Sequence, residues 1–270
     1  MIDGKKIIVV MPAYNAAKTV ERTYAEIPKQ YVDEVLLVDD ASSDGTFQIA
    51  TQLGIRTLYH EENRGYGANQ KTCYKAALDL GADIILMLHP DFQYSPKLVP
   101  AMATLLAYGP YDVVLGSRIL GTEALAGGMP FYKYVGNRIL TTFQNTLWGT
   151  KISEYHTGLR GYKRSVLERV NFELNSNGFV FDNQLIAQAL RHGFRIGEVS
   201  CPTYYHEDAS SIHFRTAVRY GSGIVRTTIE LVLARRGIWT APYLDFSSRK
   251  EDAKRSPDFV QSTVNQSSED

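Results

Sequence analysis

The sequence predicts an α/β protein with a doubly wound, mostly parallel sheet and helices on both faces, and two features of the N-terminal part predict it. Short, nearly continuous apolar runs recur there, which is typical of strands buried on both faces. Segments with helical periodicity separate these runs, as right-handed crossovers between parallel strands require. The runs are IIVVM (7–11), EVLLVD (34–39), IRTLYH (55–60), IILML (84–88) and DVVLGS (112–117).

Two of the intervening segments carry helix boundary signals. In DGTFQIATQLG (44–54), Asp44 can cap a helix and Gly54 can end it, while ANQKTCYKAALDLG (68–81) stops at Gly81. The second half is less regular. There we expect helices from Lys133, over 181–193 and from about Thr216, a short strand and a helix within 156–170, and a strand over 195–201.

Composition excludes several classes of protein. Lys plus Arg and Asp plus Glu number 29 each, so no global field attracts nucleic acid. The two cysteines, Cys73 and Cys201, form neither a CxxC motif nor a disulfide framework, which favours a reduced, cytoplasmic setting. The N-terminal apolar stretch is too short for a secretory signal, and no run of about 18 apolar residues predicts a membrane span.

Polar residues follow the predicted strands at one edge of the sheet. PAYN (12–15), DDASSD (39–44), HPDFQ (89–93) and SR (117–118) each come at a strand's carboxyl end. Ligands of doubly wound sheets bind beyond these ends. The sequence therefore predicts a binding site that these segments share.

The HPDFQ segment carries a candidate metal site. Pro90 favours an extended His89, and an extended chain would point Asp91 and Gln93 to the same side. A carboxylate and an amide oxygen suit Mg²⁺ or Mn²⁺. Two such ligands leave positions for water and diphosphate oxygens. The alternative is a solvated turn, and an isolated Asp-x-Gln sequence more often forms such a turn than a metal site.

Six motifs that occur together in one order favour the metal site over the solvated turn. They are VVMPAYNAAKTV, LLVDDASSDGT, HEENRGYGANQ, LHPDFQ, VVLGSR and YHTGLRGYKRSVL. From about residue 5 to residue 215 the chain closely resembles the family 2 glycosyltransferases, particularly the dolichyl-phosphate mannosyltransferase-like branch. The resemblance implies the GT-A fold, a nucleoside-diphosphate sugar such as a GDP- or UDP-hexose, a divalent cation (Mg²⁺ or Mn²⁺) and inversion at the anomeric carbon. It implies a metal-dependent hexosyltransferase.

The resemblance assigns donor-side roles to residues at the strand ends. Asp40 would accept hydrogen bonds from the base or ribose, with Asp39 bracing the loop, and Arg118 would meet the diphosphate or an acceptor phosphate. His89 stands where the family carries the first Asp of its metal motif, so we expect weaker metal affinity or outer positioning by His89. The residues expected to border the base are Pro12, Ala13, Tyr14 and Asn15.

The acceptor side leaves alternatives open. Asp182 corresponds to an acidic position near the acceptor, and would act as general base or simply cap its helix; Glu154 is a second acidic candidate. A phosphate acceptor needs cations more than a base, because its oxygen is already ionised. Arg160, His213 and Arg215 resemble the phosphate-clamping part of polyprenyl-phosphate transferases, although the usual Gly-x-Ser-Lys is replaced by EDASSIHFR (207–215).

We therefore expect hexose transfer to polyprenyl phosphate. A carbohydrate hydroxyl on a glycan as acceptor, or a non-catalytic sugar-nucleotide-binding protein, are the alternatives; PAYNAAKT lacks the Gly-rich basic loop of a nucleotidyltransferase. Residues 1–118 would form the nucleotide-sugar-binding half and 119–244 the acceptor half of one domain, with a polar, disordered tail over 245–270. The helices from Lys133 and Thr216 would be core, or would contact the inner face of a membrane peripherally.

Overall fold

The computed structural model describes residues 2–203 and 214–246, which form a seven-stranded sheet in the order β3-β2-β1-β4-β6-β5-β7. The pairings are parallel except those of β6, which runs antiparallel to both β4 and β5. The predicted α/β class with a mostly parallel sheet is confirmed. The strands are β1 Ile7–Ala13, β2 Glu34–Asp39, β3 Arg56–Tyr59, β4 Ile84–Met87, β5 Val113–Ser117, β6 Arg160–Lys163 and β7 Ile196–Ser200.

Helices connect these strands, and every helix expected from the sequence is present. The pattern did not predict α1, α4 or α5. Asp44 lies at the start of α2, where its Oδ1 accepts the Thr46 N–H at 3.1 Å, although Gly45 is the N-cap residue. The helices are α1 Val20–Ala25, α2 Thr46–Gln52, α3 Tyr66–Asp79, α4 Val99–Ala107, α5 Glu123–Ala126, α6 Phe131–Trp148, α7 Arg164–Arg169, α8 Phe181–Arg191 and α9 Phe214–Arg235.

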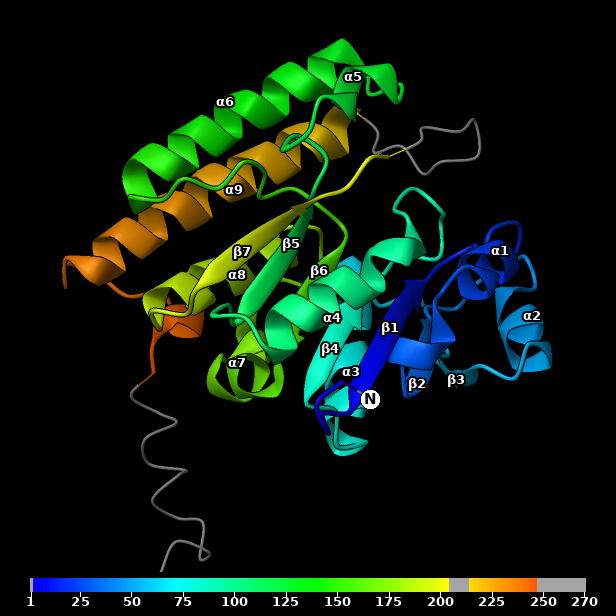
Figure 1. Cartoon of the computed structure of the whole chain (residues 1–270). Coiled ribbons are helices and arrows are strands. Elements are labelled where there is room, and N and C mark those ends of the chain that lie inside the picture. The colour runs from blue at the N-terminus through cyan, green and yellow to red at the C-terminus, as the bar shows by residue number, and fades with distance from the viewer. Residues whose placement is uncertain (1, 204–213, 247–270) are drawn as a thin grey trace, which may run out of the picture.

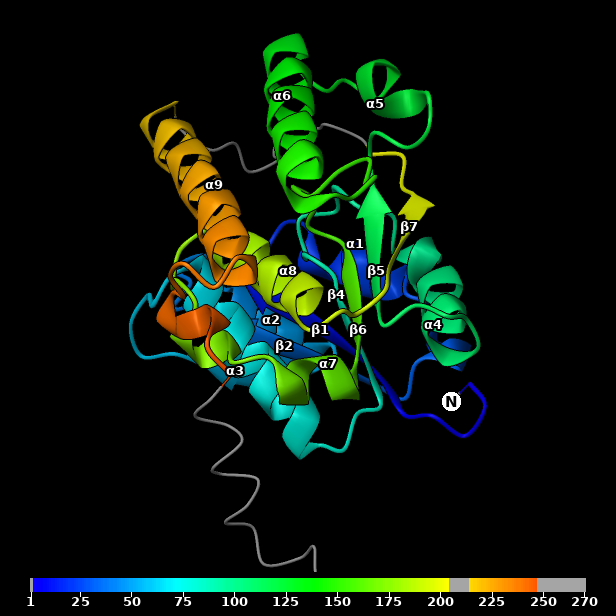
Figure 2. The same cartoon turned by 90° about the vertical axis from the view of Figure 1, so that its left-hand side faces the viewer.

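The strands β1, β4 and β5 are buried on both faces, which explains their continuous apolar runs, whereas the edge strand β3 is largely exposed. In β1, Ile7 and Val9 point into a core that they share with α1, α2 and α4. Ile8 and Val10 point into a second core, shared with α3, α7, α8 and α9. Figure 2 shows α4 on one side of the sheet and α8 on the other.

Helices α6 and α9 lie side by side at one end of the molecule (Figure 1). The Trp148 indole N–H donates to the Thr228 carbonyl at 3.1 Å and ties the two together. Away from this contact α6 exposes large apolar side chains: Phe131 is 70% exposed, Tyr132 72% and Ile139 63%. No helix within residues 2–203 and 214–246 is long and apolar enough to cross a membrane.

Candidate active site

The tips of β1 and β2 are braced against each other. Asp39 is fully buried, and its Oδ2 accepts the Ser42 N–H at 3.0 Å. The Asn15 N–H donates to Ser42 Oγ at 2.8 Å, and Asn15 Oδ1 accepts the Ser43 N–H at 3.0 Å. This network fixes the loop beside the 57% exposed ring of Tyr14.

Asp40 joins the tip of β2 to the start of α3. Its side chain is buried; Oδ1 lies 2.7 Å from His60 Nδ1 and accepts the Arg64 N–H at 2.9 Å, and Oδ2 accepts the Gly65 N–H at 2.9 Å. The Asp40 N–H donates to the carbonyl of Ala13, next to Pro12 in β1, at 2.9 Å. Asp40 therefore shapes the loop before α3 through contacts with the chain itself.

The segment after β4 turns instead of continuing as an extended strand. Strand β4 ends at Met87, Asp91 Oδ1 accepts the Gln93 N–H at 3.0 Å, and Phe92 has a φ of +58°. An Asp side chain that bonds its own backbone two residues on stabilises such a turn. The extended geometry expected for Asp91 and Gln93 is therefore wrong, although both residues do lie at the strand tip.

A divalent cation fits the tip of β4 only if a bound diphosphate supplies some of its coordinating oxygens. No group of three His, Cys, Asp or Glu side chains that could hold an ion occurs in the described part of the chain. Asp91 Oδ1 accepts the Gln93 N–H, which uses one of the carboxylate's lone pairs and leaves others that could face a cation. Together with Gln93 this gives a hard-oxygen pair, which suits an ion completed by diphosphate and water.

Tyr66, at the start of α3, joins two residues that the sequence assigned to different parts of the site. Its hydroxyl donates to Asp182 Oδ2 at 2.7 Å and lies 3.1 Å from His89 Nε2. Its ring stacks on the His89 imidazole, with centroids 5.4 Å apart, and packs against Phe179 at 4.8 Å. Burial, and then the Asp182 charge, raises the pKa of the Tyr66 hydroxyl, which keeps it a donor.

Asp182 and Arg160 form a buried pair in the same site. Asp182 Oδ2 lies 3.4 Å from the Arg160 guanidinium, while Asp182 Oδ1 is buried and has no hydrogen-bond partner among the described residues. Asp182 lies in the first turn of α8, but Val180 is the N-cap and no side-chain cap is formed. The Arg160 guanidinium also donates to the carbonyls of Thr157 and Tyr155 at 2.7 and 3.1 Å. Arg160 therefore faces the chain and stabilises Asp182.

Arg118 is held by Glu154. The fully buried Glu154 carboxylate accepts the Arg118 backbone N–H at 2.7 Å and its Nε–H at 2.8 Å. The Arg118 guanidinium also donates to the His156 carbonyl at 2.7 Å. Burial alone would raise the pKa of Glu154, but Arg118 and the hydrogen bonds outweigh it and lower the pKa below its usual range.

His156 contacts helix α9. Its Nδ1 lies 3.1 Å from the Tyr220 hydroxyl, and its Nε2 is buried without a hydrogen-bond partner in the part of the chain that the structure describes. The sequence did not single out His156, Tyr220 or Tyr66. His156 and Tyr66 lie within quoted motifs and Tyr220 lies outside them, but none of the three matches a chemical signature of its own. His213 lies outside the described residues, and of Arg215 the structure describes only the backbone, in α9.

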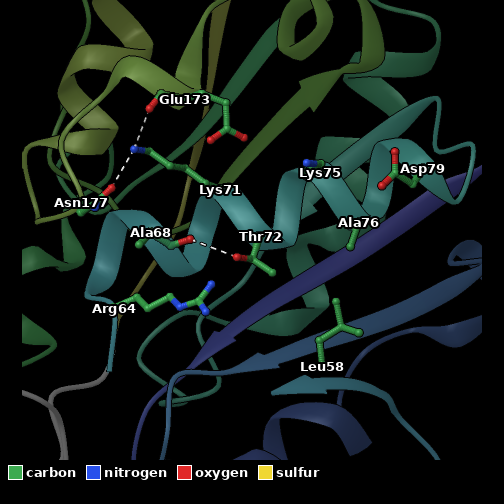
Figure 3. Close-up of a pocket in the computed structure, with 10 residues that line it drawn as sticks. All are labelled: Leu58, Arg64, Ala68, Lys71, Thr72, Lys75, Ala76, Asp79, Glu173 and Asn177. Atoms are coloured by element: carbon green, nitrogen blue, oxygen red, sulfur yellow. Dashed lines mark hydrogen bonds between the residues drawn. The ribbon is translucent and has the colours of Figure 1, made fainter. Parts of the chain in front are cut away.

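A separate surface groove of about 490 Å³ runs along α3. Figure 3 shows Lys71 crossing it to the 173–177 segment, where its ammonium group donates to the Glu173 carbonyl at 2.9 Å and to Asn177 Oδ1 at 2.7 Å. None of the described site candidates lines this groove. Lys71 therefore anchors a loop of its own chain.

A doubly wound sheet with its polar groups at the strand tips defines an α/β protein that binds ligands at this edge. The model of the glycosyl transferase family 2 matches residues 8–170, so the chain belongs to that family. The UDP-N-acetylglucosamine–dolichyl-phosphate N-acetylglucosaminyltransferase of Methanococcus voltae is 27% identical over 220 residues, 75% of this chain and 87% of that protein. The dolichyl-phosphate hexose transferase of Haloferax volcanii is 29% identical over 231 residues, 83% and 94% of the two chains.

The fold recurs in a solved structure. Glucosyl-3-phosphoglycerate synthase from Mycobacterium tuberculosis, in complex with Mn²⁺, UDP and phosphoglyceric acid, superposes with a TM-score of 0.64 at 18% identity and covers 88% of this chain and 81% of its own. The GT-A fold implied by the sequence resemblance is thereby confirmed.

Proposed function

We propose that this glycosyltransferase moves a hexose, with inversion, from a nucleoside-diphosphate sugar to polyprenyl phosphate. The observation that supports the proposal is the Tyr66 bridge, in which one hydroxyl contacts both His89, at the tip of β4, and Asp182, at the start of α8. The dolichyl-phosphate relatives support the acceptor, because two of them match most of this chain.

On the donor side, we assign the exposed Tyr14 ring and Asn15 to the nucleotide base, with Pro12, Ala13 and Asp40 supporting their loop. Asp91 and Gln93 would hold a divalent cation, which when bound supplies positive charge to the diphosphate leaving group. Arg118 adds a guanidinium at the tip of β5, which β6 separates from β4, and Glu154 orients it. Because Glu154 is fully buried in this pair, we assign it to positioning Arg118.

The acceptor side would be formed by residues 119–244. The exposed apolar residues of α6, including Phe131, Tyr132 and Ile139, suit peripheral contact with a bilayer that holds a lipid acceptor. Arg215 and His213 remain candidates for the acceptor phosphate, whereas Arg160 would act by holding Asp182.

The proposal can be tested by incubating the protein with labelled nucleotide sugars, polyprenyl phosphate and Mg²⁺ or Mn²⁺. We expect a lipid-linked, mild-acid-labile product from one donor. The Asp91→Ala variant should form it far more slowly. Binding of a nucleotide sugar without turnover on any acceptor would instead support a non-catalytic sugar-nucleotide-binding protein.

One observation favours a second acceptor class, a carbohydrate hydroxyl. Within residues 2–203 and 214–246, Asp182 Oδ1 is buried without a partner while Oδ2 is held by Tyr66 and Arg160, which suits a base that takes a hydroxyl proton. An ionised phosphate needs no such base. An acid-stable glycan product, formed while polyprenyl phosphate stays unmodified, would establish this alternative.

A further inference from the structure

We infer that Tyr66 is a positioning residue that fixes the Asp182 carboxylate for the transfer reaction and links it to His89. The inference rests on the role proposed above for Asp182, a base that takes the proton of a hydroxyl acceptor. The structure describes no other side-chain hydroxyl bonded to this carboxylate. Tyr66 comes from α3, Asp182 from α8 and His89 from the tip of β4, so three elements meet at one phenol.

The directions of the hydrogen bonds follow from the number of protons available. A phenol has one proton, and Tyr66 gives it to Asp182 Oδ2 at 2.7 Å. Its oxygen can then only accept from His89 Nε2, at 3.1 Å, so Nε2 carries the imidazole proton. His89 Nδ1 is therefore the ring nitrogen that can accept a hydrogen bond or meet a cation.

The phenol also decides which Asp182 oxygen is available. Tyr66 and Arg160 both approach Oδ2, which leaves the buried Oδ1 as the unpartnered atom. The Tyr66 ring cannot swing away easily, because it lies between His89 and Phe179. Removing the hydroxyl would let the carboxylate rotate and spread its charge over both oxygens.

The test is Tyr66→Phe, which keeps the ring and removes only the hydroxyl. We expect kcat to fall about 10- to 100-fold, as for loss of a hydrogen bond to a charged group, with the donor KM within about twofold of wild type. Tyr74→Phe is the matched control: it lies on the same helix, is buried and loses one hydroxyl bond, to Gln70 Oε1 at 2.9 Å. Its kcat should stay at the wild-type level.

Combining Tyr66→Phe with Asp182→Asn separates positioning from general packing. If Tyr66 acts through Asp182, the double variant should be no slower than Asp182→Asn alone. The inference would be overturned if the kcat losses of the two single variants multiplied in the double variant, or if Tyr66→Phe kept the wild-type kcat.

A nitrogen-15 NMR spectrum of the histidines tests the link without any reaction. Wild type should show His89 protonated at Nε2, and Tyr66→Phe, but not Tyr74→Phe, should shift that resonance. An unchanged His89 signal would refute the link. Absence of transfer in wild type would refute the proposed function alone.

Discussion

Arg118 and Glu154 form a buried ion pair that joins the end of β5 to the segment before β6. The Glu154 carboxylate also accepts a hydrogen bond from Asn137 of α6 at 2.7 Å. The Glu154 side chain thus connects the tip of β5, the segment before β6 and helix α6, which exposes apolar residues. The direction of the Arg118 guanidinium depends on this carboxylate.

Replacing Glu154 with Gln should lower the free energy of unfolding by about 3–5 kcal/mol, because the charge of Arg118 would stay mostly buried without its partner. Urea denaturation of wild type and variant measures this difference. Glu34→Gln is the control, since its pair with Arg56 lies at the surface and should contribute about 1 kcal/mol or less. Equal losses in the two variants would contradict the buried-pair interpretation.

His156 should make stability depend on pH. Burial, and then the nearby Arg160 and Arg118 against the opposing effect of Glu154, lowers the pKa of His156 from 6.5 to about 4. Between these values the unfolded chain binds the proton and the folded chain does not, so stability falls as pH falls from 6.5 to about 4.

In the variant His156→Gln this part of the pH dependence should disappear. Melting temperatures measured in steps from about pH 7 to about pH 4.5 should fall less in the variant than in wild type. The same slope in both proteins would show that His156 is not a buried neutral imidazole.

The strands could be predicted because a sheet buried on both faces needs continuous apolar runs. EVLLVD, for example, coincides with β2 Glu34–Asp39. The antiparallel direction of β6 could not be predicted from the sequence. RGYK (160–163) pairs with β4 and β5, and no local sequence pattern encodes the direction of this pairing. Helix α4 was missed because VPAMATLLA is apolar almost throughout and shows no polar face.

The candidate site was predictable as a location but not as a set of contacts. Polar strand ends identify the edge, because parallel strands share it. Which side chains meet there depends on distant segments: Tyr66 reaches Asp182, 116 positions later, and His89, 23 positions later. The turn at Asp91 likewise depends on the positive φ of Phe92. The Pro90 that precedes this segment indicates an extended chain and gives no sign of that turn.

Asp91→Ala should abolish the metal-dependent part of donor binding, because it removes the carboxylate proposed to face the cation. Thermal stabilisation by the nucleotide sugar should then become independent of Mn²⁺, and turnover should fall by about 100-fold or more. Asp79→Ala, an exposed aspartate at the end of α3, is the control and should behave as wild type. Retained Mn²⁺ dependence in Asp91→Ala would remove the metal role.

The start of α3 should tolerate no side chain at Gly67. A Cβ there would lie 2.3 Å from the Ser176 carbonyl and 2.7 Å from Phe181 Cβ, and the Gly67 N–H donates to the Asn177 carbonyl at 2.7 Å. Gly67→Ala should therefore destabilise the protein by about 1–3 kcal/mol and push α3 away from α8, which breaks the contact between Tyr66 and Asp182 and reduces turnover.

The same Gly-to-Ala change at Gly136 should stabilise the protein instead of destabilising it. Gly136 lies inside α6 with no atom within 4 Å of an added Cβ, so the variant should gain about 0.5–1 kcal/mol from helix propensity. Chemical denaturation of both variants, together with their kcat, measures the contrast. A Gly67→Ala protein as stable and active as wild type would mean that α3 and α8 need not approach this closely, and that the site does not depend on their contact.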